Sequence, residues 1–420
     1  MIRLIALVAA GLATAAFVEA QPLPSLTLEQ ALARVSARSP QRQGAVAMVE
    51  GARTAARFAG AWPNPALDVR AENWTFNSWK WSPSPDPSAR PALDAFVVLS
   101  QPVELGGKRS ARQAIGNADL QAAEAALAQV ERSLALDTTR LFLDVVRGRE
   151  TLRALEQNRD DMSGLQRAMG ARVREGMAAA SDLAKFQAET ARLETQTLRT
   201  RLELNRSVAL LGALLRWDTP LTADQLAEPP AMTLPGGDLT TLVARAVERS
   251  PDVRAAAAKE LRAKHALALE RARRVPDTTI SGGYKRTDGF DAGVIGVTLP
   301  LPLFDRNQRG VAIATGESHA AVQDRLGVEA RVAAEVRAGL EAARQLDERA
   351  RRVEEDLLRP AEVVRVAARS AFREGASDIL NLVDAERVYL EARREALLVR
   401  LDALAAAIEA RVILGEEIVR

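Results

Sequence analysis

The sequence contains 420 residues, with 57 basic and 55 acidic side chains, two histidines and no cysteine. Aromatic residues make up 4% of it although 47% of the residues are hydrophobic, and this profile favours long helices with narrow apolar seams over a compact aromatic-rich core. Basic and acidic residues are interspersed along the chain, and no basic face includes aromatic residues, which argues against nucleic-acid binding.

The first twenty residues predict a secretory signal peptide over 1–20. Arg3 precedes an apolar run over 4–17, and small residues precede the expected cleavage site after Ala20. No cysteine follows that site, so the sequence predicts no lipid anchor and no lipoprotein. No later stretch reaches the 18 or so consecutive apolar residues of a membrane helix. We therefore expect an exported protein that does not enter a membrane with helices.

The first repeat is expected over residues 21–216. Its elements, in chain order, are short helices over 26–38 and 41–62, strands over 66–77 and 92–103, a long helix over 106–175 and a return helix over 181–215. At 1.5 Å per residue the long helix is roughly 100 Å long, too long for a globular core. Its seam has a spacing of seven, which predicts a left-handed coiled coil, and includes Leu120, Leu127, Leu134, Leu141, Leu155, Met162 and Met169.

A Pro- and Gly-containing linker over 217–238 leads to a second repeat over 239–420, which has the same order. Ser39-Pro40 recurs as Ser250-Pro251, and Pro65 recurs as Pro276 at the same separation. After its short helices, the expected elements are strands over 278–286 and 290–299, a long helix over 306–374 and a return helix over 377–414. The seam of the second long helix is expected at Val322, Val336, Ala343, Ala350, Leu357, Val364 and Ala371.

Pro360 lies within the second long helix, where proline removes a backbone hydrogen bond and clashes with the preceding turn. We therefore expect a bend or a local disruption near Leu357–Pro360. The corresponding part of the first long helix, around Asp161, contains no proline.

Four strands of about ten residues in an exported chain indicate an outer-membrane barrel, whose strands need about 9–11 residues and aromatic girdles. Four strands cannot close a barrel, which needs about eight at least, so two or more chains must share it. The alternative is a soluble four-stranded sheet with exposed aromatic residues. The expected membrane-interface aromatic residues are Trp74, Phe76, Trp79, Trp81, Tyr284 and Phe290.

The sequence predicts no enzyme. It contains no nucleophile–base pair and no phosphate-binding glycine loop, and its two histidines, His265 and His319, lie alone on helical stretches. Neither cysteines nor clustered histidines or methionines supply a metal site. We therefore expect no catalytic residue, no resident metal and no cofactor.

Three motifs carry a resemblance to a known family. They are Gln101–Arg109 (QPVELGGKR) between strand and helix, and the two expected helix–helix turns, Arg174–Asp182 (REGMAAASD) and Arg373–Asp384 (REGASDILNLVD). In this duplicated arrangement the sequence resembles the TolC-like outer-membrane efflux family over essentially its whole mature length. The first motif is most similar to the CzcC/CusC branch, which serves heavy-metal efflux pumps.

The resemblance implies a mainly α fold with a small β part. Long antiparallel coiled-coil helices form a periplasmic α-barrel, and the four strands of each chain contribute to a shared twelve-stranded transmembrane β-barrel in a homotrimer. It implies an outer-membrane location with a long periplasmic extension. The implied partners are two other copies of the chain, a periplasmic adaptor, an inner-membrane pump and outer-membrane lipid.

The resemblance also assigns two sets of residues. The expected periplasmic gate is Asn381 and Asp384, and Asn381 departs from the acidic pattern of the family. The expected adaptor-docking tips, where turn chemistry alone also explains the residues, comprise Arg174, Gly176, Ser181, Asp182, Arg373, Gly375, Ser377 and Asp378.

The expected function is a passive exit duct in a tripartite efflux system, serving an inner-membrane pump of the RND type and heavy-metal cations. A duct for drug efflux or type I secretion is the alternative within this class. A soluble periplasmic coiled-coil adaptor or structural protein is the alternative of a different class.

Overall fold

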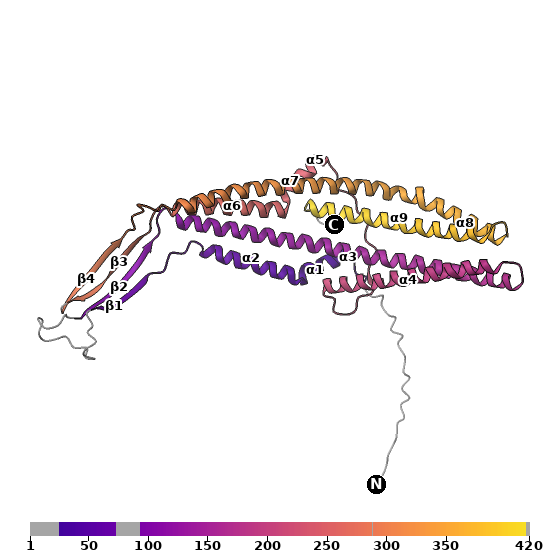
Figure 1. The fold of residues 1–420 in the computed structure, drawn as a ribbon, viewed down its shortest axis with the longest axis horizontal. Helices are drawn as coiled ribbons and strands as arrows, with labels where there is room; N and C mark the ends of the chain where they lie inside the picture. The colour runs from indigo at the N-terminus through magenta and orange to yellow at the C-terminus, as the bar shows by residue number, and fades with distance from the viewer. Residues whose placement is uncertain (1–24, 73–92, 288, 417–420) are drawn as a thin grey trace, which may run out of the picture.

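The computed structural model describes residues 25–72, 93–287 and 289–416. Within them, long helices lie side by side in a gently curved rod, and a four-stranded sheet extends at an angle from one end of it (Figure 1). The expected signal peptide over 1–20 lies outside the described residues.

The first half of the chain forms six main elements, in the predicted order. They are α1 (Leu28–Arg38), α2 (Pro40–Phe58), β1 (Ala66–Glu72), β2 (Asp94–Val103), α3 (Lys108–Arg174) and α4 (Ala180–Leu215). The strand expected over 66–77 is therefore seen only as far as Glu72, because the following residues lie outside the described ones.

The second half repeats this order, except that its long helix is divided. Its elements are α5 (Leu239–Arg249), α6 (Pro251–Ala272), β3 (Thr278–Thr287), β4 (Phe290–Thr298), α7 (Gln308–Val353), the π-helical segment η2 (Glu354–Leu358), α8 (Arg359–Arg373) and α9 (Ile379–Ile413). Helices α2 and α6 begin in the same way, with a buried serine cap, Ser39 or Ser250, followed by a proline in the first turn.

The disruption expected at Pro360 is confirmed. The α-helix ends at Val353, and in the following π-helical segment the Arg359 amide donates to the Glu354 carbonyl oxygen, one residue further back than in an α-helix. Pro360 then lies in the first turn of α8, where its missing N–H and fixed φ are tolerated. The wider π turn thus accommodates the proline within a nearly continuous helix.

The coiled-coil seam differs from the prediction at the sheet end of α3. Leu134, Leu155, Met162 and Met169 are buried as expected, but Leu120 and Leu127 are only half-buried. The buried positions there belong to a set of alanines with the same spacing of seven: Ala111, Ala118 and Ala125. At this end α3 packs between α2 and α6, and small side chains let the helices approach closely.

The second long helix also departs from its predicted seam. Val336 and Ala343 are buried, but Val364 is 52% exposed, and the buried positions beyond η2 are Ala361 and Phe372. A π turn contains more residues per turn than an α-helix. The helix beyond it is therefore rotated about its axis, and its buried side falls on other residues than the seven-residue repeat of α7 predicts.

The sheet joins the two halves. Its strand order is β1-β2-β3-β4, all pairs are antiparallel, and β2 of the first half pairs with β3 of the second. Leu99 of β2 faces Leu67 of β1 and Gly282 of β3, and Gly282 in turn faces Ile295 of β4. This register fixes which side chains share a face.

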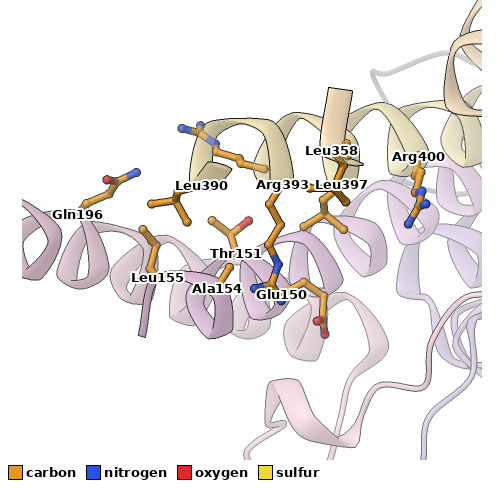
Figure 2. A pocket seen from close by; sticks show the side chains of 12 residues that line it. Glu150, Thr151, Ala154, Leu155, Gln196, Leu358, Leu390, Arg393, Leu397 and Arg400 are labelled. Atoms are coloured by element: carbon orange, nitrogen blue, oxygen red, sulfur yellow. The ribbon is translucent and has the colours of Figure 1, made fainter. Parts of the chain in front are cut away.

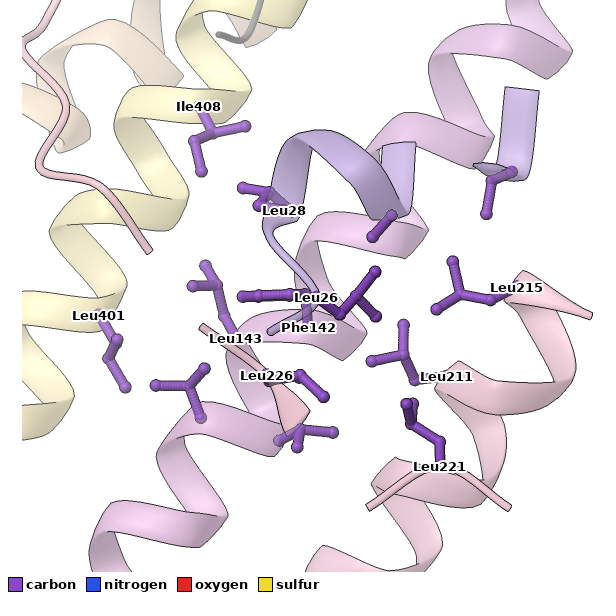
Figure 3. Close-up of a cluster of buried hydrophobic side chains, with 14 of the residues drawn as sticks. Leu26, Leu28, Phe142, Leu143, Leu211, Leu215, Leu221, Leu226, Leu401 and Ile408 are labelled. Carbon is purple, nitrogen blue, oxygen red and sulfur yellow. The ribbon is translucent and has the colours of Figure 1, made fainter. Parts of the chain in front are cut away.

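The largest cluster of buried apolar residues lies midway along the rod. It includes Phe142, Leu211 and Leu28, together with Leu221 and Leu226 from the stretch expected as a linker over 217–238 (Figure 3). Leu26 forms a parallel β-bridge with Leu226, and the short 3-10 helix η1 (Ala223–Gln225) precedes that bridge. The first part of the connection between the halves, up to Leu226, is therefore packed into the core.

Candidate functional site

Two helix–helix turns lie at the end of the rod opposite the sheet (Figure 1). At the first, the Met177 amide donates to the Arg172 carbonyl oxygen at 2.8 Å, and Gly176 has a φ of 73°. At the second, the Ala376 amide donates to the Ala371 carbonyl oxygen at 2.8 Å, and Gly375 has a φ of 76°. These are Schellman turns, and each needs a left-handed residue that glycine provides without strain.

The outgoing helices begin differently at the two tips. Asp378 caps α9, where its Oδ1 accepts from the Asn381 amide at 3.0 Å, as turn chemistry predicts. At the first tip the cap position is Ala179, which forms no side-chain cap. Ser181 and Asp182 do not cap this helix, because both lie inside the first turn of α4, where Asp182 accepts from Lys185 at 3.2 Å.

The expected gate residues lie near the start of α9. Asn381 is exposed, and its Nδ2 donates to Ser377 Oγ at 3.2 Å. Asp384 is also exposed, with 60% of its side-chain surface accessible, and it pairs with Arg387 one turn further along. Among the described residues, Arg373 donates to the Arg369 carbonyl oxygen of its own helix at 3.3 Å and forms no ion pair with Asp384.

A compact apolar cluster fixes the tips against one another. Phe186 of α4 and Phe372 of α8 meet edge to face, with ring centroids 6.3 Å apart, and both are buried. Met162 and Met169 of α3 and Leu382 of α9 join the same cluster. The two hairpins therefore share one core at this end of the rod.

Beside that cluster lies an ionic network that no sequence motif predicted. Arg369 of α8 donates through Nε to Glu386 of α9, and its Nη2 lies 2.8 Å from Asp161 Oδ2 of α3. Glu386 is only 2% exposed. The hydrogen bond to Glu386 is the main cause that raises the pKa of Arg369 above its usual range, against the opposing effect of burial. Asp161 and Arg369 are 208 residues apart, so no local pattern predicts the contact.

A small cavity of about 180 Å³ lies further from the tips, between the hairpins (Figure 2). It is lined by Leu358 of η2, Leu155 of α3 and Leu390 of α9, with Arg393 beside them. Arg393 Nη1 donates to Gln157 Oε1 of α3 at 3.2 Å. The cavity therefore opens where the π turn changes the packing of the second long helix.

One face of the sheet is apolar and exposed. Its side chains, which the register places together, are 42–91% exposed; they are Leu67, Val69, Val97, Leu99, Ile280, Tyr284, Ile295 and Val297. A contiguous apolar face over four strands is typical of a membrane or protein contact and not of a soluble surface.

The opposite face is mostly polar, and Phe96 lies on it between Arg70 of β1 and Lys285 of β3, towards the end of the sheet far from the rod. The guanidinium of Arg70 lies 5.7 Å from the Phe96 ring centroid, and Lys285 Nζ lies 5.1 Å from it. Both distances are within cation–π range. Arg70 also donates to Asp68 at 2.7 Å on the same face.

The expected interface aromatic residues are described only in part. Near the far end of the sheet, Tyr284 is 43% exposed on the apolar face. Phe290 is 77% exposed, but its pairing with Thr287 places it on the opposite, mostly polar face, so the register does not support its expected contact with lipid. The other expected members lie outside the described residues: Trp74, Phe76, Trp79 and Trp81.

Trp62, at the end of the sheet next to the rod, was not among the predicted residues. It is 55% exposed, and its ring centroid lies 5.1 Å from the Arg109 guanidinium. In the sequence, Trp62 directly precedes the proline-containing stretch that leads into β1, and this position could have predicted its place at the interface.

The motif Gln101–Arg109 joins the sheet to the rod. Arg112 forms a bidentate pair with Glu104, which is the main cause of its raised pKa. Lys108 is 7% exposed, and its Nζ lies 2.6 Å from Asp277 Oδ1, just before β3. The motif therefore binds the first half of the chain to the strand entry of the second.

Two further properties concern the part of the chain that the structure describes. None of its helices is both long enough and apolar enough to span a membrane. Its histidine, aspartate and glutamate side chains form no group of three or more that could hold a metal ion.

A family model described as "Outer membrane efflux protein" matches residues 31–215 and 242–416. The chain belongs to this family. The two matched segments correspond to the two halves of the fold, each with its strands, long helix and return helix.

Named relatives of this efflux protein include the "Cobalt-zinc-cadmium resistance protein CzcC" of Cupriavidus metallidurans, 29% identical over 88% of this chain and 85% of the relative. The "Nickel and cobalt resistance protein CnrC" of the same organism is 30% identical over 73% of this chain and 70% of the relative.

Solved structures share the fold. The outer membrane protein VceC of Vibrio cholerae has a TM-score of 0.76 and 20% identity, covering 93% of this chain and 96% of that chain. The CusC structure has a TM-score of 0.77 and 17% identity, covering 93% of this chain and 92% of that chain.

Family membership confirms three predictions: the TolC-like fold, the outer-membrane location and a role in transport instead of catalysis. The alternative of a soluble periplasmic adaptor or structural protein is therefore wrong. As an outer-membrane efflux channel, the protein works with a periplasmic adaptor and an inner-membrane pump.

Proposed function

We propose that three copies of the efflux protein form one continuous exit duct across the periplasm and the outer membrane. The sheet carries this proposal because it has an exposed apolar face and two edge strands, β1 and β4. A strand in lipid must satisfy its backbone groups with another strand. When β4 of each copy pairs with β1 of the next, three copies close a ring of twelve strands.

In this assembly the apolar face of the sheet contacts lipid and the polar face lines the pore. Arg70 and Lys285 then project into the pore beside Phe96, once in each copy. The long helices α3 and α7–α8, with the return helices α4 and α9, form the periplasmic wall of the duct.

The hairpin tips serve as the docking surface for the adaptor. The residues proposed for this contact remain those at the two turns: Arg174, Gly176, Ser181, Asp182, Arg373, Gly375, Ser377 and Asp378. Support comes from their place at the end of the rod farthest from the sheet and from the rigid Schellman geometry of both turns.

The start of α9 serves as the periplasmic gate. Asp384 is exposed and lies about two turns from the tip, so threefold symmetry brings three carboxylates around one axis. Like charges in a narrow ring repel one another and attract cations. Asn381 contributes no charge, so the ring is weaker than a double acidic ring.

The proposed cargo is heavy-metal cations, supplied by an inner-membrane pump of the RND type. This proposal rests on the relatives, which are named as resistance proteins for cobalt, zinc, cadmium and nickel. A duct for drug efflux or type I secretion is the alternative. Deleting the gene in its host and measuring tolerance to zinc, cobalt and cadmium beside a panel of drugs separates the two. Lost tolerance to drugs alone would contradict the metal cargo.

The mass of the purified protein tests the assembly. In detergent we expect a particle with three times the protein mass of the mature chain. A monomer that stays folded without detergent would contradict the shared barrel.

A further inference from the structure

Three segments meet where the sheet joins the rod, at 104–112, 270–277 and 299–309, and we call them the junction collar. The Leu105 amide donates to Asp277 at 3.2 Å, which joins the first segment to the second. Asn307 Nδ2 donates to the Glu270 carbonyl oxygen at 2.8 Å, which joins the second to the third.

The junction collar is strongly basic in a chain that is almost neutral. Its three segments contain eight arginine or lysine residues and four acidic residues, whereas the whole chain has a formal net charge of +2. Arg274, Arg306 and Arg309 are exposed, and none of them forms an ion pair within the described residues. Arg306 Nε donates only to the Pro302 carbonyl oxygen, at 3.2 Å. Positive charge is therefore available to an external partner.

The same collar exposes large apolar side chains. Leu299, Leu301 and Leu303 are 50%, 70% and 68% exposed, and Phe304 is 93% exposed. Along the chain they directly follow β4, whose Ile295 and Val297 lie on the apolar face of the sheet. The lipid-facing surface proposed above thus extends past the end of the strand.

The length of the strand gives a reason for this extension. Towards the far end of the apolar face, Arg286 and Asp291 form a charged pair 4.0 Å apart. From there to the end of β4, residues 292–298 span about 24 Å at about 3.4 Å per residue. A strand tilted by about 40° then covers about 18 Å of depth, less than the apolar band of about 25 Å of an outer-membrane barrel. Leu299 to Phe304 supply the missing depth.

We propose that the junction collar binds anionic phospholipid headgroups of the periplasmic leaflet. Leu301, Leu303 and Phe304 enter the acyl region, and Arg274, Arg306 and Arg309 pair with lipid phosphates at its border. Exposed basic clusters beside a membrane-inserted apolar surface attract anionic lipids in this way. Trp62, under the guanidinium of Arg109, lies where an interfacial aromatic residue is expected.

This inference rests on the proposed membrane insertion of the sheet, and the experiment separates the two. The full-length protein is reconstituted into nanodiscs of phosphatidylethanolamine that contain phosphatidylglycerol as the minor lipid. It is then released from them together with the lipids that it binds. Native mass spectrometry then counts the retained lipids of each class and reports the number of chains. Failure to insert or to form trimers contradicts the proposed function, whereas inserted trimers without a lipid preference contradict only this inference.

The test variant carries Arg274→Gln, Arg306→Gln and Arg309→Gln. We expect its preference for phosphatidylglycerol to fall by about fivefold for each arginine, since a basic residue at an anionic surface contributes about 1 kcal/mol. Lysine at the same three positions keeps the charge and should keep most of the preference. The control variant carries Arg199→Gln, Arg206→Gln and Arg337→Gln, three exposed arginines away from the collar, and should bind lipid like the wild type.

Two results would overturn the inference. One is an unchanged lipid preference in trimers of the glutamine variant. The other is dissociation of that variant into single chains in every lipid composition, which would assign the collar to contacts between copies.

Discussion

Arg369 and Glu386 form an ion pair between α8 and α9, and the Glu386 carboxylate has almost no contact with solvent. The same guanidinium reaches Asp161 of α3, so one side chain joins three helices near the periplasmic end. Because a buried carboxylate without a partner is costly, this arginine holds the two hairpins in one arrangement.

Replacing Arg369 by leucine should loosen the tips. It leaves Glu386 buried and unpaired, and loss of one partner of a buried pair costs about 3–5 kcal/mol. We expect faster amide hydrogen exchange over residues 361–390, measured by mass spectrometry. Arg331→Leu is the control, because Arg331 pairs with Glu335 on an exposed surface where such pairs contribute less than about 1 kcal/mol.

A second variant checks that the unpaired charge is the cause. Glu386→Leu added to Arg369→Leu removes the buried carboxylate and should restore most of the lost protection. If the double variant exchanges as fast as Arg369→Leu alone, lost packing of the arginine is the cause instead.

Acid should remove the contribution of Glu260 to stability. Hydrogen bonds from Lys264, the larger cause, and from Arg325 of α7 hold the pKa of Glu260 below its ordinary value of 4.5. The Glu260 carboxylate therefore binds a proton more readily in the unfolded chain than in the folded protein. Its contribution to stability is complete above about pH 4.5 and is lost as the pH falls through the lower pKa of the folded state.

Thermal melting of wild type and Glu260→Gln between about pH 6 and pH 3 measures this effect. The difference in Tm should be largest at pH 6 and should shrink towards pH 3. Glu335→Gln is the control: it removes an exposed ion pair on α7 and should lower Tm less than Glu260→Gln does at pH 6. If the difference in Tm between wild type and Glu260→Gln grew in acid, folding would raise the pKa of this carboxyl instead of lowering it.

Proline should be tolerated at 360 but not at the corresponding place in α3. Helix α3 continues through Asp161 without a π turn, so Asp161→Pro removes a hydrogen bond and clashes with the preceding turn, at a cost of about 3 kcal/mol or more. Asp161→Ala is the matched control because it also loses the pair with Arg369. We expect Asp161→Pro to unfold locally beyond Asp161→Ala, as measured by limited proteolysis near the first tip. Equal cleavage of both would show that α3 absorbs a proline as the second long helix does.

The proposed gate predicts a channel phenotype for Asp384→Ala. Removing the three carboxylates removes the groups that hold divalent cations in the ring. Block by divalent cations in planar bilayers should therefore weaken, and the resting conductance in their presence should rise. Glu395→Ala, an exposed acidic residue further along α9, serves as the control and should behave like the wild type. If Asp384→Ala leaves conductance, selectivity and block unchanged, the gate lies elsewhere.

The sequence by itself determined the elements and their order. Glycines at 176 and 375, prolines at the ends of helices and a repeat of seven are local signals, because each depends on neighbours within a few residues along the chain. Pro360 even predicted where the second long helix leaves α-helical geometry. The family resemblance came from the same local motifs, and the family match confirmed it.

Only the tertiary structure decided which side of each helix is buried against which neighbour. Ala111 is buried where Leu120 is not, since α3 packs between two helices there, and Val364 is exposed because η2 rotates the face that follows it. Arg369 meets Asp161 across 208 residues, and the junction collar gathers three distant segments. Such contacts depend on how the elements pack. A periodic pattern in the sequence shows that one face of a helix is apolar, but it does not show which other element covers that face.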